Sequence, residues 1–443
     1  MKITRDIFGN KQSGAVIMKY SSSLRPHVVK RLEQLEQADL VVGIPCFNNE
    51  RTIGHVLKMV SNGLGDYYRE LRAVIVVADG GSTDDTRDVV REFQLQPWQE
   101  KIVSIYRGIP GKGTALRMIF EAARLSRARA CMVVDSDLRS ITNKWVKRLI
   151  DPILSEGYDF AAPIYTRHKY DGTITNNIVY NLCQAVFGKK IRQPIGGDFA
   201  FSNRLVCFYA DKDVWETDVA RFGIDIWLTI QAIIKGFKIC QTHLGTKIHD
   251  AKDPSEHLGP MFRQVVSTLF TLMEETETYW KAFQGAEAVP VFENPDLVEP
   301  TPVEVNFHKL VASFKGGMRH FGTLWKEVFC QDCFEALKAS ANMENGRFRL
   351  PVDTWVRTLY EIAGTYHNWP MYRRRLVDLM TPIYYGRVAS FVNETREMNS
   401  LEAEKLVEDQ AAFFVDAKDY LIEVWDNPRQ CSATFLQEAE ELS

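Results

Sequence analysis

Residues 128–138 read ARACMVVDSDL, a short apolar run that predicts a buried strand. Asp135 and Asp137 follow at the end of this strand, and alternation of side chains points both to one side, with Ser136 between them. Two neighbouring carboxylates repel each other unless a cation or hydrogen-bond donors compensate. Mg²⁺ or Mn²⁺ suits this role, because such ions keep positions open for phosphate oxygens. The stretch therefore predicts a metal site at a strand tip.

Strands and helices alternate on the N-terminal side of this stretch. Further strands are predicted within ADLVVGIPCFN (38–48), RAVIVVADGGSTDDT (72–86) and KIVSIYRG (101–108). Amphipathic helices are predicted at RTIGHVLKMVSNGL (51–64) and TALRMIFEAARLSRA (114–128). This alternation predicts an α/β fold with a doubly wound, mostly parallel sheet and right-handed crossovers.

Polar signatures follow each predicted strand. They are PCFNNE (45–50), ADGGSTDD (78–85), GIPGKG (108–113) and DSDL (135–138). Ligands of such sheets bind at the carboxyl ends of the strands, so these segments are expected to meet at one site. Their shared position carries more weight than any one of the motifs.

The glycine-rich segment RGIPGKGTALR (107–117) does not fit a Walker A loop. Only two residues separate Gly108 from Gly111, and a Gly follows Lys112 where the metal-binding Ser or Thr would stand. This spacing argues against a P-loop phosphotransferase. Lys112 is instead a cation in a Gly-flanked turn, where backbone and ammonium can approach a diphosphate closely. A dinucleotide oxidoreductase is disfavoured too, because ADGGSTDD lacks the G-x-G-x-x-G order.

The bulk composition excludes several classes of protein. The chain has 443 residues, 45% hydrophobic and 25% charged, and a net charge of −3, which argues against a nucleic-acid-binding protein. No apolar run approaches the length of a membrane span, and the N-terminus lacks the apolar core of a secretory signal. We therefore expect no membrane association and a cytoplasmic location.

The eight cysteines lie mostly in apolar contexts, as expected of reduced thiols. Only Cys330 and Cys333 form a C-x-x-C pair, and no second pair is near. We interpret them as structural thiols, with a zinc or redox role as the alternative.

Changes in composition along the chain suggest four regions. Residues 276–305 are rich in Pro, Glu and Val and are predicted as a linker, and the sequence beyond them is mainly helical by periodicity. We expect the helical region to be a lid or the contact of a homodimer. The predicted organisation is an N-terminal extension (1–37), an α/β domain (38–275, with halves 38–150 and 151–275), the linker (276–305) and the helical region (306–443).

A further candidate metal ligand follows the strand-like segment FKICQTHLG (237–245). His249 lies in TKIHDAKD (246–253), and a neutral imidazole is a suitable ligand for an ion already bound by a carboxylate. Lys247 and Lys252 flank it and are expected to neutralise the phosphates of a leaving group.

Seven segments in this order resemble GT-A-fold retaining glycosyltransferases that make compatible solutes. They are VVGIPCFNNERTI (41–53), VVADGGSTDDT (76–86), GKGTAL (111–116), VDSDL (134–138), QPIGGDFAFS (193–202), FGIDIWL (222–228) and KIHDAKD (247–253). The sequence is similar to glucosyl-3-phosphoglycerate synthases, glucosylglycerate synthases and, more distantly, mannosylglycerate synthases. The resemblance covers about residues 38–275. It implies that this region is a GT-A glycosyltransferase domain, with a nucleotide-sugar half (38–150) and an acceptor half (151–275).

The resemblance implies a role for each matching residue. It implies metal binding by Asp137 and His249, and contact of Asp225 with the hydroxyls of the transferred sugar; we assign the catalytic roles to Asp137, Asp225 and Lys112. Gly196 and Gly197 would line the acceptor pocket. The nucleotide sugar is assigned, from the resemblance and the strand-end signatures together, to Pro45, Cys46, Glu50, Asp79, Lys112, Asp135, Ser136, Lys247 and Lys252.

One departure from the family bears on the acceptor. In the phosphoglycerate-using enzymes the loop matching DGTITNN (171–177) has Arg after the Gly, whereas this sequence has Thr173. A hydroxyl hydrogen-bonds a carboxylate but brings no charge to a phosphate dianion. Thr173, Thr175 and Asn176 therefore favour glycerate over 3-phosphoglycerate, although Arg167 and Arg192 are near in sequence and favour the phosphorylated acceptor.

The expected reaction transfers a hexose, glucose by preference, from a UDP-, GDP- or ADP-sugar to the 2-hydroxyl of D-glycerate with retention. 3-Phosphoglycerate as acceptor and mannose as sugar are the alternatives, and a non-catalytic nucleotide-sugar sensor is the alternative from another class. Retention by a covalent intermediate would use Asp198 or Asp225. The resemblance favours a front-face route, in which the leaving phosphate takes the acceptor's proton.

Overall fold

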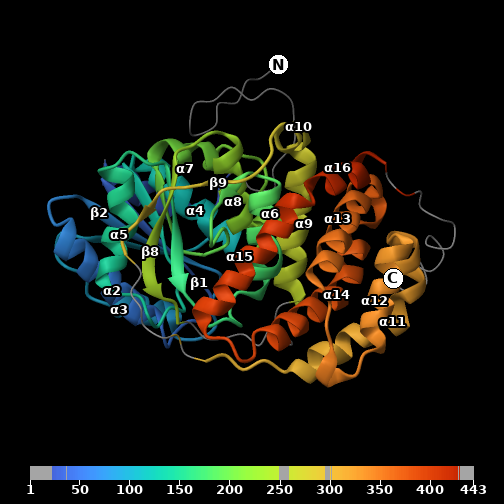
Figure 1. The fold of residues 1–443 in the computed structure, drawn as a ribbon. Helices are drawn as coiled ribbons and strands as arrows, with labels where there is room; N and C mark the ends of the chain where they lie inside the picture. Colours follow the sequence, from blue (N-terminus) through green and yellow to red (C-terminus); the bar gives the residue numbers. More distant parts are fainter. Residues whose placement is uncertain are drawn as a thin grey trace, which may run out of the picture.

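The central feature of the computed structural model is one mixed sheet of eight strands. The model describes residues 22–35, 37–248, 259–294, 300, 302–427 and 429. The strand order is β10-β8-β5-β7-β4-β1-β2-β3. Figure 1 shows the sheet among the helices of the N-terminal half. Its strands are β1 (Leu40–Cys46), β2 (Ala73–Asp79), β3 (Glu100–Ile105), β4 (Ala130–Val133), β5 (Phe160–Thr166), β7 (Phe199–Ser202), β8 (Ile239–Thr246) and β10 (Val291–Phe292).

All neighbouring strands of this sheet are parallel except β7, which runs antiparallel to both β4 and β5. The doubly wound, mostly parallel α/β sheet expected of a GT-A fold is therefore confirmed. A second sheet pairs β6 (Lys189–Lys190) with β9 (Glu287–Ala288).

Side chains of the strands alternate between two hydrophobic cores, one on each face of the sheet. Val41 and Val76 point into the core shared with α1, α4, α7, α8 and α9. Val42 and Ile75 point into the core shared with α2, α3 and α5. These helices are α1 (Pro26–Gln34), α2 (Ile53–Tyr67), α3 (Thr86–Glu92), α4 (Lys112–Leu125), α5 (Asn143–Leu154), α7 (Asn203–Ala210), α8 (Ile224–Ile234) and α9 (Gly259–Glu275).

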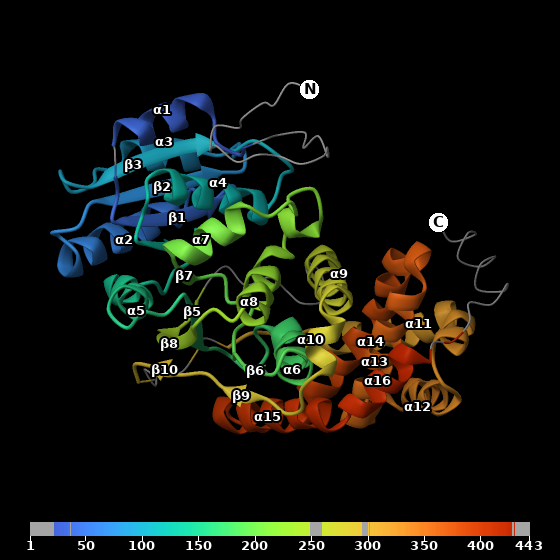
Figure 2. The ribbon, with the colours of Figure 1, turned by 90° about the horizontal axis from the view of Figure 1, so that it is seen from above.

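The C-terminal region is helical, as predicted, and it packs against the acceptor half. In Figure 2 its helices (orange to red) lie beside α6 and α9 and away from β1, β2 and β3. Trp355, Tyr384 and Phe414 belong to the same hydrophobic core as the residues of α8 and α9. The helices are α6 (Tyr180–Ala185), α10 (Glu277–Lys281), α11 (Phe307–Val328), α12 (Gln331–Asn342), α13 (Val352–Asn368), α14 (Arg373–Glu394), α15 (Ser400–Asp416) and α16 (Lys418–Asp426), with short 3₁₀ turns η2 (Asp218–Ala220), η3 (Asn345–Arg347) and η4 (Pro370–Tyr372).

The segment predicted as a linker, 276–305, is partly structured. It contains α10, pairs β9 with β6, and adds β10 to the edge of the main sheet beside β8. Sequence composition suggested a linker because the strands are only two residues long and carry no periodicity. The sheet thus extends beyond the predicted boundary at residue 275. Among the helices that the structure describes, none is both long enough and apolar enough to cross a bilayer.

Candidate active site

One cavity of about 660 Å³ opens at the carboxyl edge of the sheet. The predicted strand-end signatures and the acceptor segment meet there, although Pro45 and Thr175 are 130 positions apart in the chain. The predicted site residues that line the cavity are Pro45, Cys46, Lys112, Asp135, Ser136, Asp137, Thr173, Thr175, Gly196, Gly197, Asp225 and Lys247.

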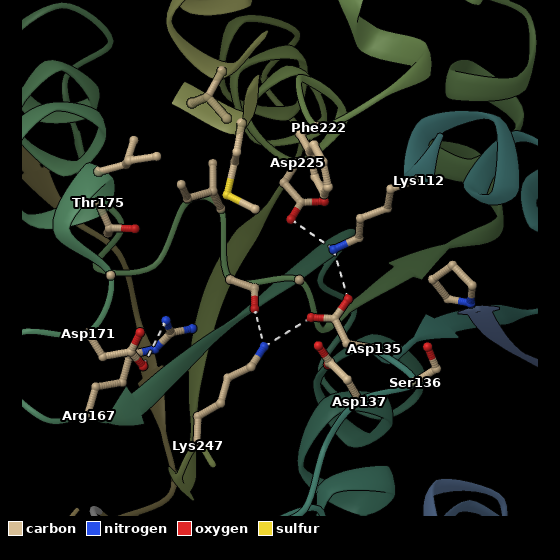
Figure 3. Close-up of a pocket in the computed structure, with 18 of the residues that line it drawn as sticks. Lys112, Asp135, Ser136, Asp137, Arg167, Asp171, Thr175, Phe222, Asp225 and Lys247 are labelled. Atoms are coloured by element: carbon tan, nitrogen blue, oxygen red, sulfur yellow. Dashed lines mark hydrogen bonds and ion pairs between the residues drawn. The ribbon is translucent and has the colours of Figure 1, made fainter. Parts of the chain in front are cut away.

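Asp135 is held between two lysines, as Figure 3 shows. Lys112 Nζ lies 2.9 Å from its Oδ1, and Lys247 Nζ lies 3.1 Å from its Oδ2. Burial alone raises the pKa of Asp135, but the two ammonium groups lower it by more, so the pKa lies well below its usual range. The carboxylate is therefore ionised, and it places two cations at the floor of the cavity.

Lys247 is fixed by a second carboxylate beneath the cavity. Its side chain is 4% exposed, and its Nζ lies 2.8 Å from Asp198 Oδ2 and donates to the Gly196 carbonyl at 2.9 Å. Asp198 is fully buried, accepts the N–H of Asp135 at 2.8 Å and accepts the Tyr165 hydroxyl. Burial lowers the pKa of Lys247, but Asp198 and Asp135 raise it above the usual value. Asp198 thus holds Lys247 in position and does not itself line the cavity.

Lys112 is the first residue of α4 and links the β4 tip to α8. Its Nζ lies 3.1 Å from Asp225 Oδ2, and Asp225 stands in the first turn of α8. Gly111 and Gly113 allow this contact, because a Cβ at either would lie within 2.5 Å of a carbonyl oxygen of the 219–220 backbone. Burial raises the pKa of Asp225, and the neighbouring Lys112 ammonium offsets only part of this rise, so the pKa stays above its usual value.

Asp225 keeps one oxygen for a ligand. Its Oδ1 is buried and has no hydrogen-bond partner among the residues that the structure describes. A buried carboxylate oxygen without a donor is costly, so a sugar hydroxyl there would be stabilising. This is the position in which the resemblance places the transferred hexose.

Two residues predicted to contact the nucleotide lie outside the cavity lining. The Asp79 carboxylate is fully buried and accepts the N–H groups of Gly81 and Ser82 and the Ser82 hydroxyl. Glu50 accepts the N–H of Asp85 at 3.1 Å. Both side chains hold the loops after β1 and β2 together, and their contact with a nucleotide stays a prediction.

Ser136 and the loop after β1 are joined by hydrogen bonds. The Ser136 hydroxyl donates to Asn49 Oδ1 and the Thr52 hydroxyl donates to the Ser136 carbonyl, both at 2.8 Å. Asn49 and the exposed ring of Phe47 line the cavity beside Pro45. Sequence reasoning did not single out Phe47, because an aromatic residue after a strand carries no specific signal.

Asp137 lies beside Asp135 and lines the cavity (Figure 3). His249 and Lys252 fall outside the described residues, so the predicted second ligand has no structural test. Carboxylate oxygens at a strand tip are the donors that Mg²⁺ and Mn²⁺ prefer. The donor chemistry at Asp137 therefore fits such an ion.

The acceptor residues divide between the cavity and the C-terminal helices. Thr173 and Thr175 line the cavity, and the Thr173 hydroxyl lies 2.7 Å from the Tyr384 hydroxyl of α14. Asn176 does not line it: its Oδ1 accepts from Arg192 Nη2 at 2.8 Å. Its role as an acceptor ligand stays a prediction.

The acceptor segment contains a π-helix, η1 (Thr175–Val179). π-Helical turns are rare and occur often at functional sites. Here side chains of the C-terminal helices bind two backbone carbonyls of this turn. Gln410 Nε2 of α15 donates to the Asn176 carbonyl and Trp355 Nε1 of α13 donates to the Asn177 carbonyl, both at 2.9 Å. The C-terminal region thus holds the acceptor segment in place.

Several lining residues were missed by sequence reasoning because they come from distant segments. Arg167 lines the acceptor side, with its Nη1 3.5 Å from Asp171 Oδ2. Arg167 had been noted only for its nearness in sequence. Apolar lining comes from Tyr106, Ile195, Phe222, Met261, Val265, Pro300, Pro302 and Val303.

Comparison with known proteins adds an independent observation. The family model described as glycosyl transferase family 2 matches residues 41–215. Glucosyl-3-phosphoglycerate synthase of Mycolicibacterium smegmatis is 26% identical over 250 residues, which cover 52% of this chain and 76% of that protein. The enzyme of the same name from Petrotoga mobilis is 24% identical over 265 residues, covering 55% and 76%.

Solved structures of a protein of the same name were also found. Glucosyl-3-phosphoglycerate synthase from Mycobacterium tuberculosis, in complex with Mn²⁺, UDP-glucose and phosphoglyceric acid, is 26% identical, covers 57% of this chain and 86% of its own, and gives a TM-score of 0.44. Its complex with Mg²⁺ and UDP gives a TM-score of 0.43 at 26% identity, covering 55% and 83%.

Proposed function

Since this chain is a family 2 glycosyltransferase distantly related to glucosyl-3-phosphoglycerate synthase, we propose that it transfers glucose from a nucleotide-diphosphate sugar to the 2-hydroxyl of D-glycerate. The product would be a glucosylglycerate-type compatible solute with the α-configuration retained. The observation that carries the proposal is the pair of lysines, Lys112 and Lys247, held by Asp135 beside Asp137. Two fixed cations at a strand tip are suited to the negative charge of a departing diphosphate.

Lys112 and Lys247 would carry the electrostatic part of catalysis. Their ammonium groups lie on opposite oxygens of one carboxylate, so they are oriented before substrate binds. Preorganised charges of this kind need little rearrangement as charge develops on the leaving group. Asp137 would hold Mg²⁺ or Mn²⁺, with His249 as the predicted second ligand, and the bound ion would supply Lewis-acid stabilisation of the diphosphate.

Asp225 would orient the hexose. Its Oδ2 is bound to Lys112, and its unpartnered Oδ1 is available to accept a sugar hydroxyl. Asp198 is a poor candidate for a covalent nucleophile, because it is fully buried and both of its oxygens accept hydrogen bonds. We therefore assign retention to the front-face route, in which a leaving-phosphate oxygen takes the proton of the acceptor hydroxyl and no protein base is needed.

The test of the site is Asp137→Ala, with Asp409→Ala on the exposed face of α15 as the matched control. Loss of a metal ligand is expected to remove several kcal/mol of transition-state stabilisation, so kcat/KM falls at least about 1,000-fold. The circular dichroism spectrum and the unfolding midpoint stay unchanged. Substantial transfer by Asp137→Ala, with metal still bound, would contradict the assignment. Tight donor binding by the wild type without turnover on any acceptor would support a sensor instead.

Glycerate is the proposed acceptor because Thr173 offers a neutral hydroxyl at the position where a cation would be needed to bind the phosphate of 3-phosphoglycerate. The second candidate, 3-phosphoglycerate, is favoured by the names of the two relatives and by Arg167 in the cavity lining. Initial rates with both acceptors, measured against UDP-, GDP- and ADP-glucose and the mannose donors, decide between them. A clear preference for 3-phosphoglycerate would overturn the argument from Thr173, while leaving the metal and lysine assignments intact.

A further inference from the structure

A second cluster of metal-ligating side chains lies in the C-terminal helices, away from the proposed catalytic site. Cys330 caps the N-terminus of α12, and its Sγ accepts the N–H of Cys333 at 3.3 Å. The Sγ of Cys333 is buried and lies 3.3 Å from Glu361 Oε1 of α13. The two sulfurs and a Glu361 carboxylate oxygen all lie within 4.8 Å of one another. Three ligand atoms from two separate helices thus converge on one point.

The Glu361 carboxylate is held by further hydrogen bonds. Its Oε2 accepts the N–H of Cys330 at 2.6 Å, and its Oε1 accepts the hydroxyl of Tyr420 on α16. The guanidinium of Arg357 lies 4.7 Å from the centre of the Tyr420 ring. These contacts fix the orientation of the carboxylate, as outer hydrogen bonds do for metal ligands.

Within the described part of the chain, hydrogen bonds hold the Glu361 carboxylate, which accepts the Cys330 N–H, the Cys333 thiol and the Tyr420 hydroxyl. Glu361 is 4% exposed, and among the residues that the structure describes no Lys, Arg or His forms an ion pair with it. Buried charges in proteins are otherwise paired or bound to metal ions. A cation at the point where both sulfurs converge would supply the missing charge.

We propose that Cys330, Cys333 and Glu361 bind a thiophilic divalent cation, Zn²⁺, in a site separate from the catalytic one. A tetrahedral zinc ion with Zn–S bonds of about 2.3 Å and Zn–O bonds of about 2.0 Å holds its ligand atoms roughly 3.5–3.8 Å apart. The separation of 3.3 Å between Cys333 Sγ and Glu361 Oε1, and the 4.8 Å limit for the whole set, need little adjustment. Sulfur ligands select zinc over the Mg²⁺ that suits the catalytic carboxylate. Water completes the fourth position.

The site joins helices that support the acceptor segment. Cys330 and Cys333 lie at the junction of α11 and α12, Glu361 lies on α13, and its partner Tyr420 lies on α16. The helix that carries Glu361 also carries Trp355, whose indole holds the π-helix of the acceptor half. Zinc at this site would therefore fix α12 to α13, the helix whose Trp355 contacts the predicted acceptor segment.

The same two thiols offer a different chemistry, a disulfide between Cys330 and Cys333. A disulfide would leave the Glu361 carboxylate without a cation and would need an external disulfide as the oxidant. The zinc site uses all three converging groups and needs no oxidant. For this reason we favour the metal, and the disulfide is an outcome that the experiment distinguishes.

Cobalt titration of the full-length protein tests the proposal. The probe is Co²⁺, added under a phosphine reductant and with excess Mg²⁺ to fill the catalytic site. We expect one equivalent of Co²⁺ to give a thiolate-to-cobalt charge-transfer band and tetrahedral d–d bands, and one equivalent of Zn²⁺ to remove both. The band does not depend on glycosyl transfer, so it reports on this site even if the proposed function is wrong.

Variants assign the band to its ligands. Cys330→Ser and Cys333→Ser are expected to abolish it, whereas the control Cys207→Ser, on α7, keeps it. Tyr420→Phe leaves all three ligands and is expected to weaken Zn²⁺ binding about 10-fold, a readout that survives if the cysteine variants do not fold. A wild type that gives no charge-transfer band, a band that persists in Cys330→Ser, or a Cys330–Cys333 disulfide that forms in place of metal binding would each overturn the proposal.

Discussion

The position of Asp135 depends on Gly197, and Gly197→Ala tests how much this matters. Gly197 has a φ of +89°, and a Cβ there would lie 2.2 Å from Asp135 Oδ2 and 3.0 Å from its Cγ. Gly236 offers a matched control, because its φ is +68° and a Cβ there would meet nothing within 4 Å. Both substitutions put alanine in the left-handed region, but only one meets the site.

The two effects can be separated in magnitude. The left-handed conformation alone costs alanine about 1–2 kcal/mol, and both variants share this loss. At Gly197 the Asp135 carboxylate must also retreat by roughly 1 Å to restore van der Waals contact. That movement lengthens its ion pairs with Lys112 and Lys247, now 2.9 and 3.1 Å. Breaking a buried pair costs about 3–5 kcal/mol, so partial loss predicts about 2–4 kcal/mol beyond the control.

Urea denaturation and donor titration together provide the assay. We expect Gly197→Ala to lower the free energy of unfolding by that additional amount and to weaken binding of the nucleotide sugar in the presence of Mn²⁺. Gly236→Ala should bind the donor as the wild type does. Equal losses of stability in the two variants, or unchanged donor affinity in Gly197→Ala, would show that the lysine–aspartate arrangement does not depend on this close approach.

Three further changes probe other parts of the molecule. Burial lowers the pKa of Lys418 to about 8, so the unfolded chain binds the Lys418 proton more tightly than the folded chain does. The unfolding free energy of the wild type relative to Lys418→Met should therefore rise between pH 8 and 10.5, by at most about 1.4 kcal/mol per pH unit. Urea denaturation across that range measures the difference. Gln410→Leu removes the hydrogen bond to the Asn176 carbonyl and should raise KM for the acceptor several-fold while donor affinity, measured by calorimetry, stays unchanged. Thr173→Arg brings a cation to the acceptor segment and should shift the ratio of initial rates toward 3-phosphoglycerate.

The sequence was sufficient to predict the edge of the sheet at which the site forms. Asp135, Lys112 and Pro45 each follow a strand or precede a helix, and parallel strands bring their carboxyl ends together whatever the details of packing. Asp225 and Gly197 came from the resemblance alone, since neither lies in a pattern with its own chemical signal. The cavity contains all five.

Contacts between distant residues could not be predicted in the same way. Lys247 and Asp135 are 112 positions apart, and their ion pair depends on how β8 and β4 are placed in the sheet. Asp79 and Glu50 were assigned to the nucleotide because they are acidic and follow strands. In the folded chain nearby N–H groups donate to both carboxylates. The sequence alone does not distinguish an acidic residue that closes a loop from one that binds a ligand.

The C-terminal helices support the internal structure of the acceptor half (151–275). A lid or a dimer contact, as predicted, would not be needed for the internal structure of the predicted catalytic domain. The C-terminal helices instead make hydrogen bonds to the backbone and side chains inside that domain. Gln410 and Trp355 donate to backbone carbonyls of the π-helix, and the Tyr384 hydroxyl contacts the Thr173 side chain. A buried carbonyl left without a donor costs about 1–3 kcal/mol. Trp355 therefore stabilises the π-helix through the Asn177 carbonyl, while the Asn176 carbonyl accepts from Gln410 and also from Asn181 Nδ2. The segment predicted to bind the acceptor and the helical region therefore form a single structural unit, although their residues are separated by about half of the chain.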